Sequence, residues 1–432
     1  MKLSRIGRAS LATIASLAMG LGMTACGGGT VAFLWVTAAK TTSNGAGNSI
    51  TGFKVDDYTG NLTEMVKSPY PSNGTNPAMS VLAPGGRFLF VVNQGDGTPQ
   101  HAGAGISVFS VGGDGVLNFQ QSYLPPFPGS GTTQDYASPV WLQMDSSGQH
   151  LLVLTSRAPI ASNGSATPYG CTVADCGAVF VYSVAGDTGR LTLVQNQQVK
   201  VNGLAITYFP TGPRPFQMKL VAGGFLVIAN SGDQSVTIYN TSNNDGQLTL
   251  AGNQMTIQTN VSSISSVTSG GTYLYLTDGA LNKIYAYTVS ANGLGSVVGS
   301  PFDNNQVVVG SKPVWTATDA RAKFLFVLNQ QTSSVNCQNT NACNSISAYN
   351  IESTGKLTPI SGINNPYRVG AGPTCMLQDP SNKYVYTSNS LDSTVTGYEI
   401  NQATGELNVL RRGSTFSVTG QPTCLVASGS VD

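Results

Sequence analysis

One short apolar segment recurs seven times along the chain, and this recurrence restricts the fold more than any other feature. Its copies begin at residues 33, 88, 151, 225, 273, 324 and 384, so successive copies start 48 to 74 residues apart. A residue that tolerates tight turns stands five positions after each start except the first, where it is Ala38: Asn93, Ser156, Asn230, Asp278, Asn329 and Asn389. Such a period predicts a repeat architecture built from one small unit.

A second segment follows every copy and carries an aromatic residue at the same place: Phe53, Phe109, Tyr182, Tyr239, Tyr287, Tyr349 and Tyr398. Since aromatic residues make up only 8% of the chain, seven out of seven is not a coincidence. A turn with glycine and then leucine two residues later comes next in six copies: Gly60/Leu62, Gly115/Leu117, Gly189/Leu191, Gly246/Leu248, Gly355/Leu357 and Gly405/Leu407. In the fifth copy Gly293 directly precedes Leu294.

A shorter segment, often opened by proline, precedes most copies: Pro77, Pro139, Pro215, Pro313 and Pro373. Each unit therefore has four strands in about 50–60 residues, which is typical of a propeller blade. The fold class predicted from this pattern is all-β, a seven-bladed β-propeller.

The two ends of the chain predict how the ring closes. The first copy lacks a proline-led segment, and residues 420–425 (GQPTCL) nearly duplicate residues 372–376 (GPTCM). We expect the C-terminal strand to complete the first blade, with residues 423–425 beside residues 33–36. Closure removes the free strand edges that an open array would expose, whereas a solenoid would need polar caps.

Composition excludes several classes of function. Charged residues are 9% of the chain, against about 25% in typical soluble domains. The formal net charge of +1 excludes the concentrated basic face that nucleic-acid binding needs. An apolar content of 41% excludes a disordered chain. We expect a monomer that binds no nucleic acid.

The N-terminus has the features of an export signal. Lys2, Arg5 and Arg8 precede an uncharged run over residues 9–23, shorter than the roughly 20 residues that span a bilayer. Met23-Thr24-Ala25-Cys26, followed by three glycines, resembles a bacterial lipoprotein signal. This predicts a signal peptide over 1–25, a tether over 26–31 and the propeller over 32–432, with lipidation at Cys26.

A lipidated Cys26 implies an exported protein of the cell envelope that contacts the membrane only through its lipid. The alternative is that an ordinary signal peptidase cuts nearby, so that Cys26 is merely part of the new terminus. Both interpretations predict export.

Six further cysteines are expected in an oxidising compartment. Cys171 and Cys176 are five residues apart, Cys337 and Cys343 are six apart, and each pair is predicted to close its own loop by a disulfide. The spacings and the lack of a nearby histidine do not favour zinc, so no metal site is predicted.

Cys375 and Cys424 fall at equivalent positions on the innermost strands of adjacent blades. A bond across the seam and two buried free thiols both remain open at this stage.

The copies resemble the seven-bladed lactonase-like propeller family, which includes bacterial 6-phosphogluconolactonase and is related to YVTN repeats. The resemblance covers roughly residues 32–430 and is carried best by residues 379–395 and 400–407. In active members, His, Arg and Glu near the central opening handle the substrate, which implies opening of a lactone. The positions that match here read Pro139-Val140-Trp141, Pro313-Val314-Trp315 and Pro373-Thr374-Cys375, and only Arg214 keeps the family's arginine.

Lactone opening needs a base for water and a positive group for the developing oxyanion. Arg214 is the candidate for the positive group, and His101, in a glycine-rich loop, is the candidate base; a solvated loop histidine is the alternative for His101. His150 is expected at the surface edge of a strand. Trp141 and Trp315 either line the channel or fill the core between blades, and core filling is favoured. Asp56, Asp57 and Asp233 fit turns better than a calcium site.

Three functions remain for the ring. The first is a non-catalytic binding scaffold that uses the long loops of blades two, three and six, with an unknown protein or a small carbohydrate or lactone as its partner. The second is a lactone hydrolase working from the central opening. The third is a structural component of the envelope. None of them implies a cofactor.

Overall fold

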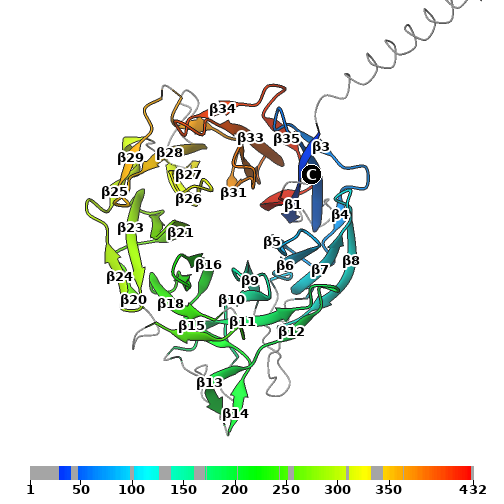
Figure 1. The fold of residues 1–432 in the computed structure, drawn as a ribbon, viewed down its shortest axis with the longest axis vertical. Helices are drawn as coiled ribbons and strands as arrows, with labels where there is room; N and C mark the ends of the chain where they lie inside the picture. Colours follow the sequence, from blue (N-terminus) through cyan, green and yellow to red (C-terminus); the bar gives the residue numbers. More distant parts are fainter. Residues whose placement is uncertain are drawn as a thin grey trace, which may run out of the picture.

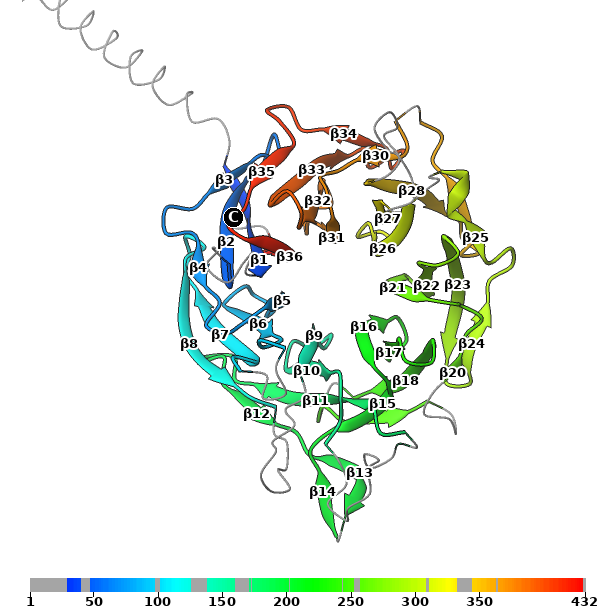
Figure 2. The ribbon, with the colours of Figure 1, turned by 180° about the vertical axis from the view of Figure 1, so that it is seen from behind.

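The computed structural model describes residues 29–39, 47–97, 102–125, 138–159, 171, 173–201, 203–242, 244–251, 257–307, 311–331, 344–362 and 364–429. Seven antiparallel sheets stand radially around a central axis, which confirms the seven-bladed β-propeller (Figure 1 and, from behind, Figure 2). A single 3₁₀ turn, η1 (Asn304–Gln306), interrupts the strands of the described part. None of the described residues forms a helix that is long and apolar enough to cross a membrane.

Each blade has four strands in radial order. The innermost strands, in blade order, are β36 (Gln421–Ala427), β5 (Pro77–Leu82), β9 (Pro139–Met144), β16 (Pro215–Val221), β21 (Ile264–Gly270), β26 (Ser311–Thr318) and β31 (Pro373–Gln378). The second strands are β1 (Thr30–Ala39), β6 (Phe88–Asn93), β10 (His150–Thr155), β17 (Phe225–Asn230), β22 (Tyr273–Asp278), β27 (Phe324–Gln331) and β32 (Tyr384–Asn389).

The third strands are β2 (Ser49–Asp56), β7 (Gly105–Val111), β11 (Cys176–Val184), β18 (Ser235–Thr241), β23 (Lys283–Ser290), β28 (Ser345–Ile351) and β33 (Thr394–Ile400). The fourth are β3 (Leu62–Glu64), β8 (Leu117–Tyr123), β12 (Leu191–Leu193), β19 (Leu248–Leu250), β24 (Gly293–Ser296), β29 (Leu357–Pro359) and β34 (Leu407–Val409).

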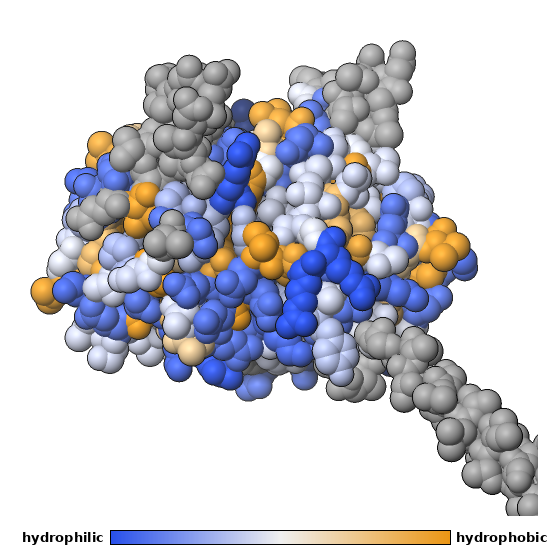
Figure 3. All heavy atoms as spheres, turned by 90° about the horizontal axis from the view of Figure 1, so that it is seen from above, coloured by the Kyte–Doolittle hydropathy of each residue, from blue (hydrophilic) through white to orange (hydrophobic). Residues whose placement is uncertain are grey.

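In six blades a short additional strand pairs with the third strand: β4 (Tyr70–Pro71), β15 (Phe209–Pro213), β20 (Ile257–Gln258), β25 (Phe302–Asp303), β30 (Tyr367–Arg368) and β35 (Thr415–Ser417). A separate hairpin of β13 (Asn196–Val201) and β14 (Leu204–Ile206) projects outward from the third blade (Figure 1). On the outer rim, apolar side chains are scattered among polar ones (Figure 3).

The ring closes as the sequence predicts. β36 pairs antiparallel with β1, and Val36 lies opposite Leu425. A disulfide between Cys375 and Cys424 joins β31 of the seventh blade to β36 of the first, so the bonded alternative is the correct one. On the outer side of the same seam, Lys383 Nζ donates to Asp57 Oδ1 at 2.6 Å.

The repeated glycines hold neighbouring blades together. Gly60, Gly115, Gly189, Gly246, Gly355 and Gly405 all have φ between +66° and +81°. A Cβ on Gly405 would lie 2.5 Å from Phe324 Cδ1, a ring that opens the second strand of the preceding blade. Gly115 meets Phe33, and Gly189 meets Phe88, in the same way. Glycine is required here both by the left-handed backbone and by the close approach of the ring.

The second strand of the third blade, β10, begins one residue earlier than predicted, at His150 instead of Leu151, and this corrects the prediction for His150. Gly246 contacts His150 at the place where its equivalents contact Phe or Tyr, so His150 is the first residue of the repeated strand. It is 5% exposed rather than a surface residue, and its Nδ1 lies 2.8 Å from Asp145 Oδ2. The run of leucines from Leu151 conceals the shift, because an apolar residue fits either alignment.

The two mouths of the ring differ. Innermost strands begin, and second strands end, at the mouth that we call the loop mouth; the opposite one is the turn mouth. Four connections between second and third strands at the loop mouth are long, spanning residues 40–48, 94–104, 156–175 and 332–344. The last three belong to the blades for which enlarged loops are predicted, and the first belongs to the first blade. At the turn mouth, innermost and second strands are joined by two to five residues.

Candidate functional site

One side-chain position on every innermost strand forms a layer across the central opening. Its residues pair with the fifth residue of the repeated apolar segment in the second strand, just after a bulge in the innermost strand. We call them the Trp layer: Met79, Trp141, Gln217, Ser266, Trp315, Cys375 and Cys424.

The two tryptophans of the layer meet across the opening. Trp141 and Trp315 have ring centroids 5.3 Å apart and planes inclined by 31°. They come from β9 and β26, on opposite sides of the ring (Figure 1). They therefore line the channel, and both also pack against hydrophobic clusters between blades. The neighbouring positions Leu142 and Thr316 are more deeply buried.

The other members of the layer tie adjacent innermost strands together. Gln217 Oε1 accepts from the Val267 backbone N–H at 2.8 Å, which joins the fourth blade to the fifth. Ser266 Oγ lies 2.9 Å from Thr316 Oγ1, which joins the fifth blade to the sixth. With the Cys375–Cys424 bond, these contacts cross-link adjacent innermost strands at the level of the two tryptophans.

Arg214 lies at the loop mouth, directly before β16. Its Nε lies 3.1 Å from Asp175 Oδ2, and its side chain is 72% exposed. Its backbone has φ +50° and is held by three hydrogen bonds. Its N–H donates to the Asp175 carbonyl at 3.1 Å, and its carbonyl accepts from the Ser231 N–H at 3.0 Å and from Ser231 Oγ at 2.9 Å. The arginine is thus fixed at its base while its guanidinium faces solvent.

Asp175 is a functional candidate that sequence reasoning missed. It precedes Cys176, and the predicted Cys171–Cys176 disulfide is present and closes the loop that carries it. The first residues of β11 pair with β15, the strand that leads to Arg214, and this brings the carboxylate to the guanidinium. The only signal in the sequence is an acidic residue inside a small disulfide loop, and nothing there indicates its partner.

Several predicted residues lie outside the described part of the chain: His101, Cys26, Cys337 and Cys343. Among the described residues, no group of three or more His, Cys, Asp or Glu side chains converges as a metal site would require. Asp56 Oδ1 accepts from the Thr59 backbone N–H at 2.9 Å and from Thr59 Oγ1 at 2.7 Å, as expected for a turn.

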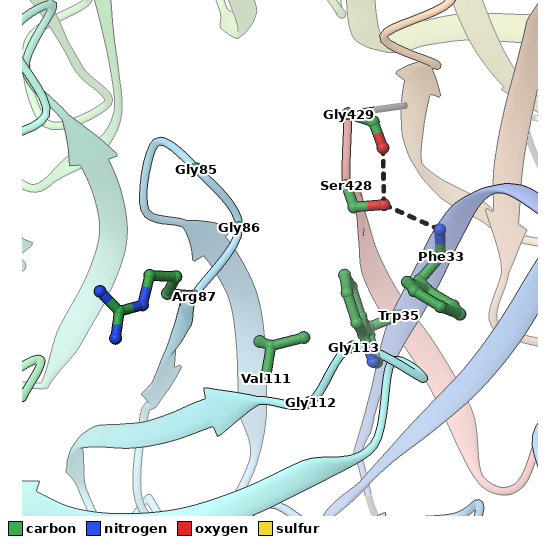
Figure 4. Close-up of a pocket in the computed structure, with 10 residues that line it drawn as sticks. All are labelled: Phe33, Trp35, Gly85, Gly86, Arg87, Val111, Gly112, Gly113, Ser428 and Gly429. Atoms are coloured by element: carbon green, nitrogen blue, oxygen red, sulfur yellow. Dashed lines mark hydrogen bonds between the residues drawn. The ribbon is translucent and has the colours of Figure 1, made fainter. Parts of the chain in front are cut away.

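A pocket of about 460 Å³ opens at the turn mouth, beside both ends of the described chain (Figure 4). Between the second and third blades the neighbouring turns touch, where Gly148 contacts Pro84. The first blade has no such turn, because its innermost and second strands are opposite ends of the chain. The pocket is lined by Phe33, Trp35, Gly85, Gly86, Arg87, Val111, Gly112, Gly113, Ser428 and Gly429. Among these lining residues, Arg87 has the one ionisable side chain.

Comparisons with known proteins agree with this architecture. Residues 340–425 match the family described as "Lactonase, 7-bladed beta-propeller". The structure resembles a periplasmic gluconolactonase of Pseudomonas aeruginosa, with a TM-score of 0.64 at 18% identity, over 92% of this chain and 99% of that one. A search of curated proteins finds no match.

Two putative 6-phosphogluconolactonases have the same architecture. The one from Bacteroides fragilis aligns with a TM-score of 0.62 at 17% identity, over 92% of this chain and 98% of that one. The one from Bacteroides uniformis aligns with a TM-score of 0.64 at 15% identity, over 93% and 100%. This chain therefore has the fold of the seven-bladed lactonase-like propellers, and its residues 340–425 carry the sequence pattern of that family.

Proposed function

We propose that this protein is an exported hydrolase that opens the lactone ring of a sugar acid at the loop mouth. The observation that carries the proposal is the ion pair of Arg214 with Asp175, because it sets a cation and a carboxylate side by side at the rim of the opening. Those are the two groups that lactone hydrolysis needs.

Each partner has a defined task. The Asp175 carboxylate accepts a proton from water as the water oxygen bonds to the lactone carbonyl carbon. The Arg214 guanidinium donates hydrogen bonds to the carbonyl oxygen as that oxygen gains negative charge. The bond from the carbonyl carbon to the ring oxygen then breaks, and the ring oxygen takes up the proton, which leaves a hydroxy acid.

The local structure supports these tasks. Arginine has five N–H donors, and the contact with Asp175 uses only one guanidinium nitrogen, so donors remain for a substrate. Both side chains are solvent-exposed, at 72% and 38%, so a small polar substrate can reach them. The similarity to a periplasmic gluconolactonase supports a sugar lactone as substrate, and the two disulfides fit export. Anchoring through Cys26 is part of the proposal.

The test is lactone turnover by the purified mature protein. Glucono-δ-lactone, its 6-phosphate and an acyl lactone are followed by acid release in a pH-stat, above the spontaneous rate. We expect Arg214→Ala and Asp175→Asn each to lower kcat/KM by about 10²-fold. Arg190→Ala and Asp187→Asn, exposed in a turn at the opposite mouth, are matched controls with full activity. Equal turnover by all four variants would refute the assignment.

A second candidate is a binding scaffold at the same mouth. It is favoured by the innermost strands, on which the structure places no His, Asp or Glu. Under this alternative the wild-type protein binds a sugar lactone or a sugar acid but does not increase the rate of ring opening. Calorimetric titration with gluconate beside the turnover assay separates the two functions.

A further inference from the structure

The opening between the Trp layer and the turn mouth has its own chemistry, and we propose that it binds an organic carboxylate on Lys219. The proposal does not depend on the proposed function, which concerns the loop mouth. The relevant side chains pair with the third residue of the repeated apolar segment in each second strand. We call them the Lys layer: Val81, Gln143, Lys219, Thr268, Ala317, Leu377 and Val426.

The Lys layer lies on the same face of the strands as the Trp layer. Lys219 is two residues beyond Gln217 along β16, a separation of about 6.7 Å. Six of the seven members are only half-buried although they belong to the innermost strands, and Thr268 is buried. Solvent therefore reaches this level of the opening.

Lys219 is a cation without a counter-ion. The innermost strands carry two charged residues, Lys219 and Lys312, and Lys312 lies on the other side of the Trp layer. None of the described carboxylates forms an ion pair with Lys219. The surrounding protein removes water from the ammonium and lowers its pKa. An ammonium in such surroundings gains more from an anion than an exposed one does.

The rest of the layer indicates what kind of anion fits. Gln143 and Lys219, on the third and fourth blades, are half-buried polar residues, and the buried Thr268 continues the polar arc on the fifth blade. The four remaining blades present an apolar arc: Val81, Ala317, Leu377 and Val426. One side of the wall can hold a carboxylate by charge and hydrogen bonds, while the other contacts hydrocarbon. A carboxylate with an apolar tail matches both sides, whereas inorganic phosphate matches only the first.

The test is a ligand-observed NMR titration of the mature protein with hexanoate. Hexanamide, its neutral analogue, and inorganic phosphate are the comparison probes. We expect hexanoate to bind and both comparison probes to bind at least about tenfold more weakly. Phosphate binding as tightly as hexanoate would refute the two-sided wall.

Variants locate the site. Lys219→Met keeps the length of the side chain without its charge and should weaken hexanoate binding at least about tenfold. Lys312→Met, the matched change beyond the Trp layer, should leave the affinity unchanged, and Lys219→Arg should retain binding. Ala317→Phe fills the apolar arc while leaving the lysine in place, so it should also abolish binding, and it keeps the test available if Lys219→Met fails to fold. Unchanged affinity in Lys219→Met, or in a folded Ala317→Phe, would overturn the proposal.

Discussion

The seam disulfide between Cys375 and Cys424 should stabilise the fold, because it fastens the strand that closes the ring. Cys375 and Cys424 are 49 residues apart in sequence. A cross-link over that distance stabilises the fold by about 4 kcal/mol through lost entropy of the unfolded chain. With an unfolding entropy of about 2.1 cal/mol/K per residue over about 400 residues, this corresponds to about 5 °C in Tm.

The double variant Cys375→Ala/Cys424→Ala tests this value by calorimetry. Cys171→Ala/Cys176→Ala is the matched control, because its bond spans only five residues. The same relation gives that bond about 2 kcal/mol, or about 2.5 °C. Amide hydrogen exchange adds a local measurement: the β1–β36 amides should exchange faster in the seam variant only. If the seam variant loses no more Tm than the control, or if β1–β36 exchange is unaltered, the reasoning on ring closure is wrong.

Three further predictions concern the contacts between blades and the pH range of stability. Gly405→Ala should lower the free energy of unfolding by about 3 kcal/mol, because the new Cβ lies 2.5 Å from Phe324 and the backbone φ is +75°. Gly85→Ala, with a φ of +79° but open space around it, should lower it by only about 1 kcal/mol. Urea unfolding measures both values. Burial raises the pKa of Asp145, but hydrogen bonds from Ser147 and His150 outweigh it and leave that pKa below its usual value. Asp145 therefore adds stability above about pH 4 that is lost as the pH falls through its lowered pKa, and Asp145→Asn should lower Tm at pH 7 yet converge with wild type near pH 2. Burial raises the pKa of Tyr287 and of Tyr384 to about 12, so the stability that these neutral phenols support is complete below about pH 10 and is lost as the pH rises further. Absorbance at high pH should show phenol ionisation at the same pH at which the far-ultraviolet circular dichroism signal is lost. Ionisation without unfolding would contradict this.

The ring could be predicted from sequence because its contacts repeat. Each turn glycine needs its left-handed backbone and its aromatic neighbour at the same time, so Gly405 and Phe324 leave a pattern that recurs with the blade. The repeat pattern places the second strand of the third blade one residue too late, because His150 occupies the position that Phe or Tyr occupies in the other blades. A polar ring paired with a carboxylate satisfies the same contact, and this substitution has no signature in hydrophobicity.

The site could be predicted only in part. Arg214 is next to a strand that the repeat identifies, so its place at a mouth follows from the fold. Asp175 reaches it through a disulfide loop whose path depends on the pairing of β11 with β15, and no periodicity encodes that pairing. Trp141 and Trp315 point into the opening because a bulge directly precedes each of them, after Pro139 and Pro313, and a bulge changes the face of the residues after it.

The contact between the tilted indoles of Trp141 and Trp315 narrows the central opening partway between its two mouths. The two side chains come from the third and sixth blades, so their contact joins strands that the ring places on opposite sides. A substitution at either tryptophan is therefore expected to alter both the width of the opening and the packing between these two blades.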